Sequence, residues 1–238
     1  PRLAGADISP DWAYLGGMAP SGLGLSPSEA KAFYDDYGAR QDGRRHEDQA
    51  REELRRLSDF EHACNVFELG LGTGSFAASI FEENFPTTTR YLGVDVSSTM
   101  VELARAKLER FEPRARVVET DGSLAFKEPD GYYDRFVGNY VFDLLPVDQI
   151  REGLEEAHRL LAVRGKLCVV NLTKGEGFLS KTVSSLWSGV QRMGRRAVGG
   201  CRPIDINSHL DRSDWEIKYQ DLVTVSGVPS QVTIALAR

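Results

Sequence analysis

The stretch of sequence that decides the fold reads Val66-Phe67-Glu68-Leu69-Gly70-Leu71-Gly72-Thr73-Gly74-Ser75. Apolar, strand-forming residues lead into it, and a helical pattern begins where it ends. Its glycines allow a tight turn and let another molecule approach the main chain closely. In an open sheet of parallel strands, such a turn after the first strand is typical of a site for a nucleotide-like ligand.

Strand-like and helical segments alternate around this turn. Runs of β-type residues occupy 64–69, 90–95, 115–119, 134–141 and 166–172, and helical patterns separate them at 74–84, 98–110 and 147–161. This alternation predicts βαβ units and a largely parallel sheet with helices on both faces. Two more strand-like runs, 215–225 and 230–237, flank a Ser-Gly-Val-Pro turn. They predict a closing hairpin, which makes one strand antiparallel.

The N-terminal part has its own pattern. Residues 1–25 are rich in glycine, proline and alanine and are predicted to form an irregular arm. Ser26 and Glu29 form a capping box, so a helix begins there and ends near Tyr37. A second helix, 44–58, is charged at most positions, which predicts a solvated surface helix.

Composition bounds the class of protein. The chain has 238 residues and a formal net charge of −6, with 41% apolar and 27% charged residues, as in an ordinary soluble globular protein. No apolar run approaches the roughly 20 residues that span a bilayer. An acidic chain is also a poor candidate for wrapping nucleic acid, which favours basic domains.

The cysteines indicate a reducing environment and no metal. Cys64, Cys168 and Cys201 lie far apart in the sequence, without a zinc-type pair or a disulfide framework. We therefore expect no metal site and a cytoplasmic or organellar (stroma or matrix) location. The sequence begins at Pro1, which predicts a processed or truncated N-terminus.

The spacing of the glycines limits which nucleotide-like ligands the turn could bind. The dinucleotide-binding motif is Gly-x-Gly-x-x-Gly, but Ser75 occupies the position of its last glycine or alanine. No lysine follows in the manner of a phosphate-binding loop, which disfavours a nucleoside triphosphate. A nicotinamide-dependent oxidoreductase remains as an alternative.

Two acidic residues add to this picture. Asp95 ends the second predicted strand, where a carboxylate can accept both hydroxyls of a ribose. Asp121 follows the third strand and is placed to accept a hydrogen from an adenine amino group, although it is also a common turn residue. Adenine and ribose without phosphate describe S-adenosylmethionine (SAM).

These motifs together resemble the class I SAM-dependent methyltransferases, close to the ubiquinone/menaquinone-biosynthesis (methyltransferase type 11) branch. The resemblance runs from Val66 to about Thr173. It is carried by the glycine turn after Glu68, by Asp95 with the following Ser-Ser-Thr-Met, by Asp121-Gly122, and by Ala157-His158-Arg159-Leu160-Leu161 before Gly165-Lys166-Leu167. It implies a doubly wound, Rossmann-like α/β sheet of seven strands in the order 3-2-1-4-5-7-6.

The resemblance also implies a cofactor site for SAM, which leaves as S-adenosylhomocysteine (SAH). The glycine turn would pack behind the methionyl group, and Asn139 with Tyr140 would face that end of the cofactor. Asp95 would bind the ribose, and Met100 and Asp121 would contact the adenine. The predicted cofactor-binding residues are Glu68, Gly70, Gly72, Thr73, Gly74, Asp95, Val96, Met100, Asp121, Gly122, Ser123, Asn139 and Tyr140. Glu68 has a plainer alternative role, as a cap of the first helix after the turn.

The acceptor is predicted to be a small, partly apolar molecule. Methyl transfer from a sulfonium is an in-line displacement that needs alignment and exclusion of water. No Asn-Pro-Pro-Tyr run follows the fourth strand, which weighs against methylation of a base or amide nitrogen. The candidate substrate-binding residues are Tyr34, Tyr37, Trp187 and Arg202, and the candidate acid or base is His209.

The charge of the chain is unevenly distributed. Residues 174–203 contain six basic side chains and one acidic one, so the rest of the chain has a net charge of about −11. We expect an N-terminal arm with cover helices over 1–60 and a methyltransferase domain over 61–238, in which 174–212 form an insertion on the acceptor side. This insertion is interpreted as a lid, or as the segment that receives an anionic or lipophilic acceptor. In the second case, residues 178–196 would contact a membrane surface. A non-catalytic partner subunit and a nucleic-acid methyltransferase remain as alternatives.

Overall fold

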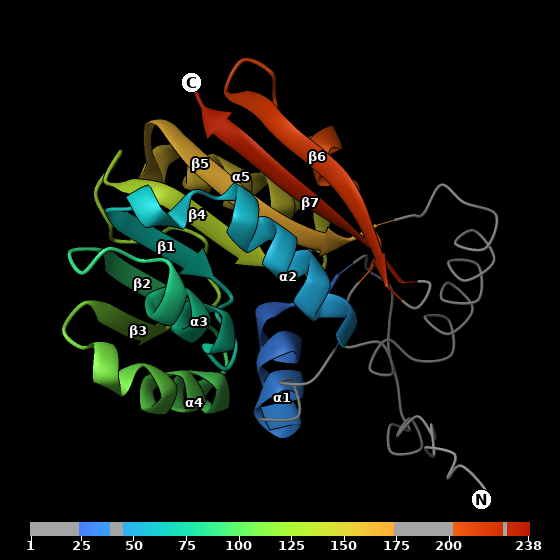
Figure 1. Ribbon diagram of the computed structural model, residues 1–238. Helices are drawn as coiled ribbons and strands as arrows, with labels where there is room; N and C mark the ends of the chain where they lie inside the picture. Colours follow the sequence, from blue (N-terminus) through green and yellow to red (C-terminus); the bar gives the residue numbers. More distant parts are fainter. Residues whose placement is uncertain (1–23, 39–44, 174–201, 226–227) are drawn as a thin grey trace, which may run out of the picture.

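A seven-stranded sheet is the centre of the molecule. The computed structural model describes residues 24–38, 45–173, 202–225 and 228–238 (Figure 1). The strands are β1 Asn65–Leu69, β2 Arg90–Asp95, β3 Ala115–Glu119, β4 Tyr133–Asn139, β5 Leu161–Leu172, β6 Trp215–Val225 and β7 Val228–Ala237. Their order is β3-β2-β1-β4-β5-β7-β6, and β7 runs antiparallel to β5 and β6. The predicted strand order is confirmed.

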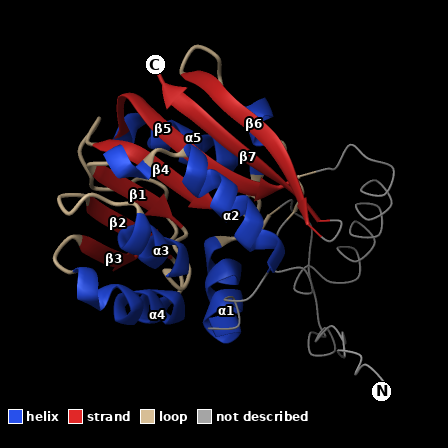
Figure 2. Cartoon of the chain, viewed as in Figure 1, coloured by secondary structure: helices blue, strands red, loops and turns tan. Residues whose placement is uncertain are grey.

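Helices cover both faces of this sheet (Figure 2). The α-helices are α1 Pro27–Tyr37, α2 Arg45–Leu57, α3 Ser75–Glu83, α4 Ser98–Leu108 and α5 Val147–Leu160, and the 3-10 helices include η2 Phe60–His62, η3 Glu109–Phe111 and η5 Ile206–His209. Three of the helices, α2, α3 and α4, share one apolar core with the sheet, and α5 and η5 share a second core on the other face. This is the two-layered covering that alternating strands and helices predict.

The predicted start of α1 is confirmed in detail. The Ser26 hydroxyl accepts a hydrogen bond from the Glu29 N–H at 3.3 Å, and the Glu29 carboxylate accepts one from the Ser26 N–H at 2.9 Å. The helix ends at Gly38, whose φ of 55° is in the left-handed region that glycine favours. The boundaries of the remaining elements match the predicted ones within a few residues, except that β5 begins at Leu161, directly after α5.

The predicted helix over 44–58 is confirmed as α2, but one of its faces is buried and only the rest is solvated. Ala50 and Leu54 of α2 are fully buried, and α2 packs on β5, β6 and β7. These two side chains lie four residues apart and form a narrow apolar stripe on one face of the helix. Charged residues occupy most of the other positions, so the average composition of the segment concealed the stripe.

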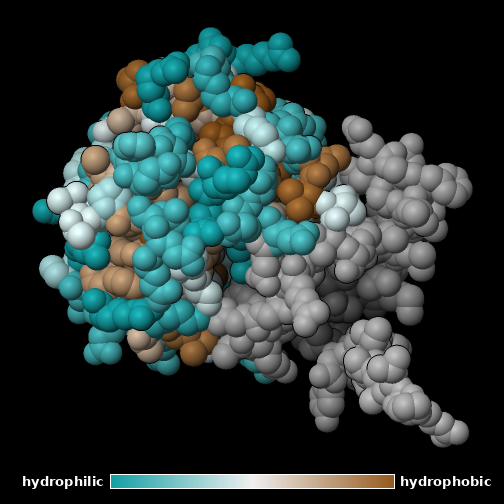
Figure 3. Space-filling model, viewed as in Figure 1, coloured by the Kyte–Doolittle hydropathy of each residue, from teal (hydrophilic) through white to brown (hydrophobic). Residues whose placement is uncertain are grey.

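The surface is mostly polar in the face drawn in Figure 3, with apolar residues in scattered groups. Within the described ranges, none of the helices combines the length and the apolar character needed to cross a bilayer. In the described part of the chain, the buried apolar residues form two cores beside the sheet.

The buried position of α2 leads to a stability prediction. Leu54→Ala is expected to lower the free energy of unfolding by about 2–5 kcal/mol, because it leaves a cavity between α2 and the sheet. Val163→Ala is the matched control, since Val163 is 77% exposed and its truncation should cost less than about 0.5 kcal/mol. Urea denaturation followed by circular dichroism measures both. Equal losses in the two variants would show that α2 does not pack as described.

Candidate functional site

A cavity of about 790 Å³, its mouth included, opens at the carboxyl ends of the parallel strands. This is the edge at which open α/β sheets bind ligands. The predicted site residues that the structure brings together in its wall are Tyr34, Gly70, Gly72, Asp95, Val96, Gly122, Ser123, Asn139 and Tyr140. They come from α1, from the turn after β1 and from the ends of β2 and β4, with Gly122 and Ser123 from the loop after β3.

The glycine turn requires its glycines. Gly70, Gly72 and Gly74 have φ values of 67°, 55° and 75°, which other L-residues adopt only with strain. A side chain at Gly70 would also lie 2.8 Å from a Val141 methyl carbon. The carbonyl of Val94 accepts hydrogen bonds from the N–H groups of Gly70 and Leu71, at 2.8 and 3.1 Å, and so ties the turn to β2.

Asp95 joins the glycine turn to the start of α4. One of its carboxylate oxygens accepts a hydrogen bond from the Gly72 N–H at 2.9 Å, and the other accepts one from the Ser97 N–H at 3.0 Å. Burial raises the pKa of Asp95 above its usual range, and these backbone hydrogen bonds oppose the rise. A carboxylate has about four acceptor positions, so both oxygens retain lone pairs for the two hydroxyls of a ribose.

Glu68 lies buried beneath the turn. Its carboxylate accepts hydrogen bonds from the Tyr91 hydroxyl at 2.6 Å and from the Asn139 amide at 3.1 Å. Burial raises the pKa of Glu68 to about 7, while these hydrogen bonds and the charge of Arg51 act in the opposite direction. Gly74, without a side-chain cap, begins α3, so the structure does not support the alternative of Glu68 as a helix cap.

Asn139 offers an unused acceptor in the cavity wall. Because its amide nitrogen donates to Glu68, its carbonyl oxygen Oδ1 is the free end. This oxygen is buried and has no hydrogen-bond partner among the described residues. Such an atom is unfavourable unless a ligand supplies a donor. The ammonium of a SAM methionyl group is a donor of that kind, so Asn139 fits the methionyl end of this cofactor and Asp95 fits its ribose.

The neighbouring Tyr140 is held in an unusual backbone conformation. Its φ of 53° is rare for a tyrosine, and its hydroxyl is hydrogen-bonded to the Ser230 hydroxyl at 2.8 Å. This bond ties the end of β4 to β7 and keeps the ring in the cavity wall.

Helix α1 forms the cover of the cavity. Asp35 accepts hydrogen bonds from the Ser97 hydroxyl at 2.6 Å and from the Thr99 N–H at 3.3 Å. Burial alone would raise the pKa of Asp35, but these bonds and the neighbouring Lys31 hold it below its usual range. Lys31 also donates to the Val96 carbonyl at 3.2 Å. The side chain of Tyr37, also on α1, lies outside the described part.

Several predicted cofactor residues lie outside the cavity wall. Met100 is fully buried in the core, and the Asp121 carboxylate accepts a hydrogen bond from the Ser123 N–H at 2.9 Å within its own turn. The Thr73 hydroxyl is 3.4 Å from the Lys107 ammonium, on the far side of the glycine turn. Glu68 and Gly74 lie one layer behind the wall. The roles of these residues toward a cofactor stay predictions.

Two predicted acceptor-side residues, His209 and Arg202, do not line the cavity, whereas Tyr34 does. His209 lies half-buried on η5, where burial and the charges of Arg202 and Arg151 lower its pKa. Arg202 donates to the Leu145 carbonyl behind the wall. Trp187 falls outside the described residues, as does the predicted membrane contact of 178–196.

Some residues of the site escaped the sequence analysis. Tyr91 is the donor that holds Glu68, and Gly93 leaves room for it, because a side chain at Gly93 would lie 2.7 Å from the Tyr91 hydroxyl. The alternation of a strand places Tyr91, Gly93 and Asp95 on one face, and this was the available signal. Apolar wall residues were also missed: Leu25, Leu69, Leu124, Val141, Leu144 and Leu145.

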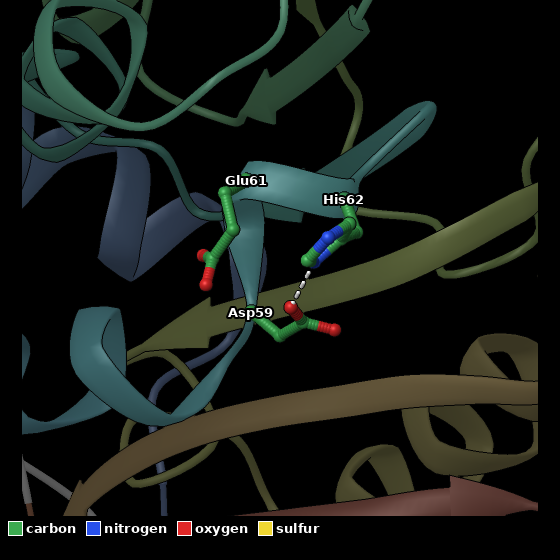
Figure 4. A group of neighbouring side chains, drawn as sticks. All are labelled: Asp59, Glu61 and His62. Atoms are coloured by element: carbon green, nitrogen blue, oxygen red, sulfur yellow. Dashed lines mark hydrogen bonds and ion pairs between the residues drawn. The ribbon is translucent and has the colours of Figure 1, made fainter.

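A second group of polar side chains lies away from the cavity. Figure 4 shows Asp59 hydrogen-bonded to the His62 ring, with Glu61 nearby, and these three residues could supply metal ligands. Asp59 is, however, paired with Lys166 at 3.1 Å and with Arg135 at 3.3 Å. Two cationic partners already neutralise this carboxylate, which makes it a poor ligand for a metal ion.

Comparison with known proteins agrees with this geometry. Residues 66–165 match the family model of a methyltransferase domain. The chain is also similar to the chloroplastic 2-methyl-6-phytyl-1,4-hydroquinone methyltransferase of Spinacia oleracea, with 28% identity over 123 residues. That match spans 51% of this chain and 33% of the spinach enzyme, so the chain accounts for about a third of this relative.

Many solved structures share the fold, among them a cyclase and an N-methyltransferase. The cyclase SpnF superimposes with a TM-score of 0.68 at 14% identity, over 91% of this chain and 99% of its own. The 1,6-didemethyltoxoflavin-N1-methyltransferase of Burkholderia thailandensis, solved with its substrate and SAH, has a TM-score of 0.62 at 14% identity, over 93% of both chains. The matched segment, residues 66–165, is a class I SAM-dependent methyltransferase domain and holds the glycine turn, Asp95 and Asn139.

Proposed function

We propose that this protein transfers a methyl group from SAM to a small, partly apolar molecule. The observation that carries the proposal is the cavity, in which Asp95 with lone pairs to spare and the unpartnered carbonyl oxygen of Asn139 lie at the glycine turn. These are acceptors for a ribose diol and an ammonium, and the described cavity wall has no lysine or arginine for a phosphate. That composition favours SAM over a nicotinamide dinucleotide.

The protein's part in the reaction is mainly to bind and to align. SAM supplies an electrophilic methyl group on its sulfonium. Asp95 would fix the ribose, and Asn139, oriented by Glu68, would fix the methionyl end, so that the sulfur between them is held in one place. Alignment of this kind lowers the barrier of a displacement because it removes freedom of motion before the reaction.

The remaining wall would exclude water and receive the acceptor. Val141, Leu144 and Leu145 line one side of the cavity, and Leu25 of the cover segment lies against them, since its N–H donates to the Leu144 carbonyl at 2.7 Å. These side chains favour an apolar part of the acceptor. The described wall contains no histidine, which favours an acceptor that needs little help in losing its proton.

The spinach relative is described as a hydroquinone methyltransferase, and the Burkholderia structure as an N-methyltransferase. Both descriptions support a small-molecule acceptor. SpnF is described as a cyclase on the same fold, so the decisive experiment must follow the methyl group itself.

The first prediction tests methyl transfer. With methyl-labelled SAM and a fractionated cell extract, we expect the label to appear in a small apolar product identified by mass spectrometry. Asp95→Ala should weaken SAM and SAH binding in calorimetry by roughly 10- to 100-fold, because hydrogen bonds to a charged group contribute about 1.5–3 kcal/mol. Asp130→Ala is the control, since its side chain is 80% exposed. Binding that survives Asp95→Ala would refute the ribose assignment, and unlabelled products throughout would refute methyl transfer.

The second prediction concerns pH. Because the pKa of Glu68 is about 7 in the cofactor-free protein and a cationic ligand favours its ionised form, SAM affinity should rise from pH 6 to pH 8 and fall as Glu68 is protonated. The change is limited to about tenfold per pH unit. Glu68→Gln cannot titrate, so its affinity should vary less over this range. Identical pH profiles for the two proteins would contradict the role of Glu68.

The third prediction concerns the cover. Asp35→Asn removes the charged acceptor that ties α1 to the start of α4, so SAH should dissociate about fivefold faster in stopped-flow displacement. The adjacent and exposed Asp36 provides the matched control as Asp36→Asn. If both variants release SAH at the wild-type rate, α1 does not control the exchange of the cofactor.

A further inference from the structure

Tyr91 of β2 belongs to a buried hydrogen-bond network that reaches the cavity wall. Its hydroxyl donates to Oε2 of Glu68 at 2.6 Å, and the amide nitrogen of Asn139 donates to Oε1 of the same carboxylate at 3.1 Å. Tyr91 and Glu68 are each 2% exposed, whereas Asn139 is part of the cavity wall. Two donors from different strands therefore meet at one buried carboxylate, and one of the two donors also faces the ligand cavity.

The register of the sheet builds this network. Glu68 of β1 lies opposite Gly93 of β2, and Tyr91 comes two residues before Gly93 on the same face of the strand. The Tyr91 ring extends past Gly93 toward Glu68, because a side chain at Gly93 would lie 2.7 Å from the Tyr91 hydroxyl and 2.9 Å from its ring. A glycine at this position leaves the space through which the hydroxyl reaches the carboxylate.

The direction of these hydrogen bonds determines which atom of Asn139 faces the cavity. The single proton of the Tyr91 hydroxyl is donated to Glu68. An ionised carboxylate only accepts hydrogen bonds, so the NH2 group of Asn139 points to Glu68 and its carbonyl oxygen Oδ1 is left for the cavity. This oxygen is buried and has no partner among the described residues. It is an acceptor that can receive a donor group of a ligand.

Protonation of Glu68 reverses this arrangement. Because Tyr91 donates to Oε2, an added proton goes to Oε1, the oxygen that faces Asn139. The Asn139 carbonyl then has to accept from Glu68, and its NH2 group turns to the cavity, where it opposes a ligand ammonium. Burial raises the pKa of Glu68 to about 7, and the charge of Asp95 adds to the rise. The Tyr91 hydrogen bond is the largest opposing influence, ahead of Asn139 and the charge of Arg51.

We propose that Tyr91 is a positioning residue, which keeps Glu68 ionised and thereby keeps the carbonyl oxygen of Asn139 turned toward the cavity. The proposal rests on the binding of SAM in this cavity. Tyr91 does not itself line the cavity, so it acts on the cofactor through these two residues. Its removal should therefore affect ligands that carry the amino acid group and spare those that lack it.

The test follows the pH dependence of two ligands in calorimetry from pH 6 to pH 9. SAH carries the amino acid group, whereas 5′-methylthioadenosine keeps the adenine, ribose and thioether and lacks that group. In the wild type, SAH affinity should rise with a midpoint near pH 7, where Glu68 ionises. Tyr91→Phe removes a donor to this carboxylate, so the midpoint should move up by about one pH unit. SAH should then bind about fivefold more weakly at pH 7 and recover almost fully at pH 9, and 5′-methylthioadenosine should bind as before.

Tyr133→Phe is the matched control, because Tyr133 is another buried strand tyrosine whose hydroxyl donates to a carboxylate, that of Glu128, at 2.7 Å. It should leave both pH profiles in place. In the Glu68→Gln background, where this position cannot titrate, Tyr91→Phe should shift no midpoint. A midpoint that Tyr91→Phe leaves unmoved, or an equal loss of both ligands at every pH, would overturn the proposal while cofactor binding stands. If the wild type binds neither ligand, the proposed function fails and the role of Tyr91 fails with it.

Discussion

The carboxylate of Asp95 is the joint on which the site depends. Through Gly72 it holds the left-handed turn from which α3 starts, and through the Ser97 N–H it holds the start of α4. The Ser97 hydroxyl in turn donates to Asp35 and so ties the cover helix α1 to the same point. Asp95 thus joins the turn before α3 to the start of α4, and Ser97 links the same point to α1.

This arrangement buries carboxyl groups, and burial makes their ionised form unfavourable. Glu68 and Asp95 are both buried, and burial raises the pKa of each carboxyl. The charge of Asp95 raises the pKa of Glu68 further, while hydrogen bonds from Tyr91 to Glu68 and from the Ser97 and Gly72 N–H groups to Asp95 offset only part of the rise. Perturbed carboxyls of this kind collect at functional sites because a ligand completes their surroundings. A cofactor with a sulfonium and an ammonium supplies the missing positive charge.

The sheet alone does not decide the reaction. The same architecture occurs in a protein described as a cyclase and in one described as an N-methyltransferase. The segment that matches the methyltransferase model, 66–165, contains the turn, Asp95 and Asn139, whereas α1 and α2 lie before it. Of these two helices, α1 brings Tyr34 to the cavity and α2 packs on β5, β6 and β7.

Local patterns in the sequence were sufficient for the strands and helices, the capping box at Ser26, the glycine turn and the position of Asp95, because each depends on residues near one another along the chain. The strand order was predicted from the family resemblance, because pairing between distant strands is not visible in a local pattern. Tertiary structure alone decided which side chains face the cavity. It buried α2 through Ala50 and Leu54, paired Tyr91 with Glu68, and placed Met100 and His209 behind the wall. Periodicity reports which residues share a face of an element, but the partner of that face is set by packing between segments far apart in the sequence.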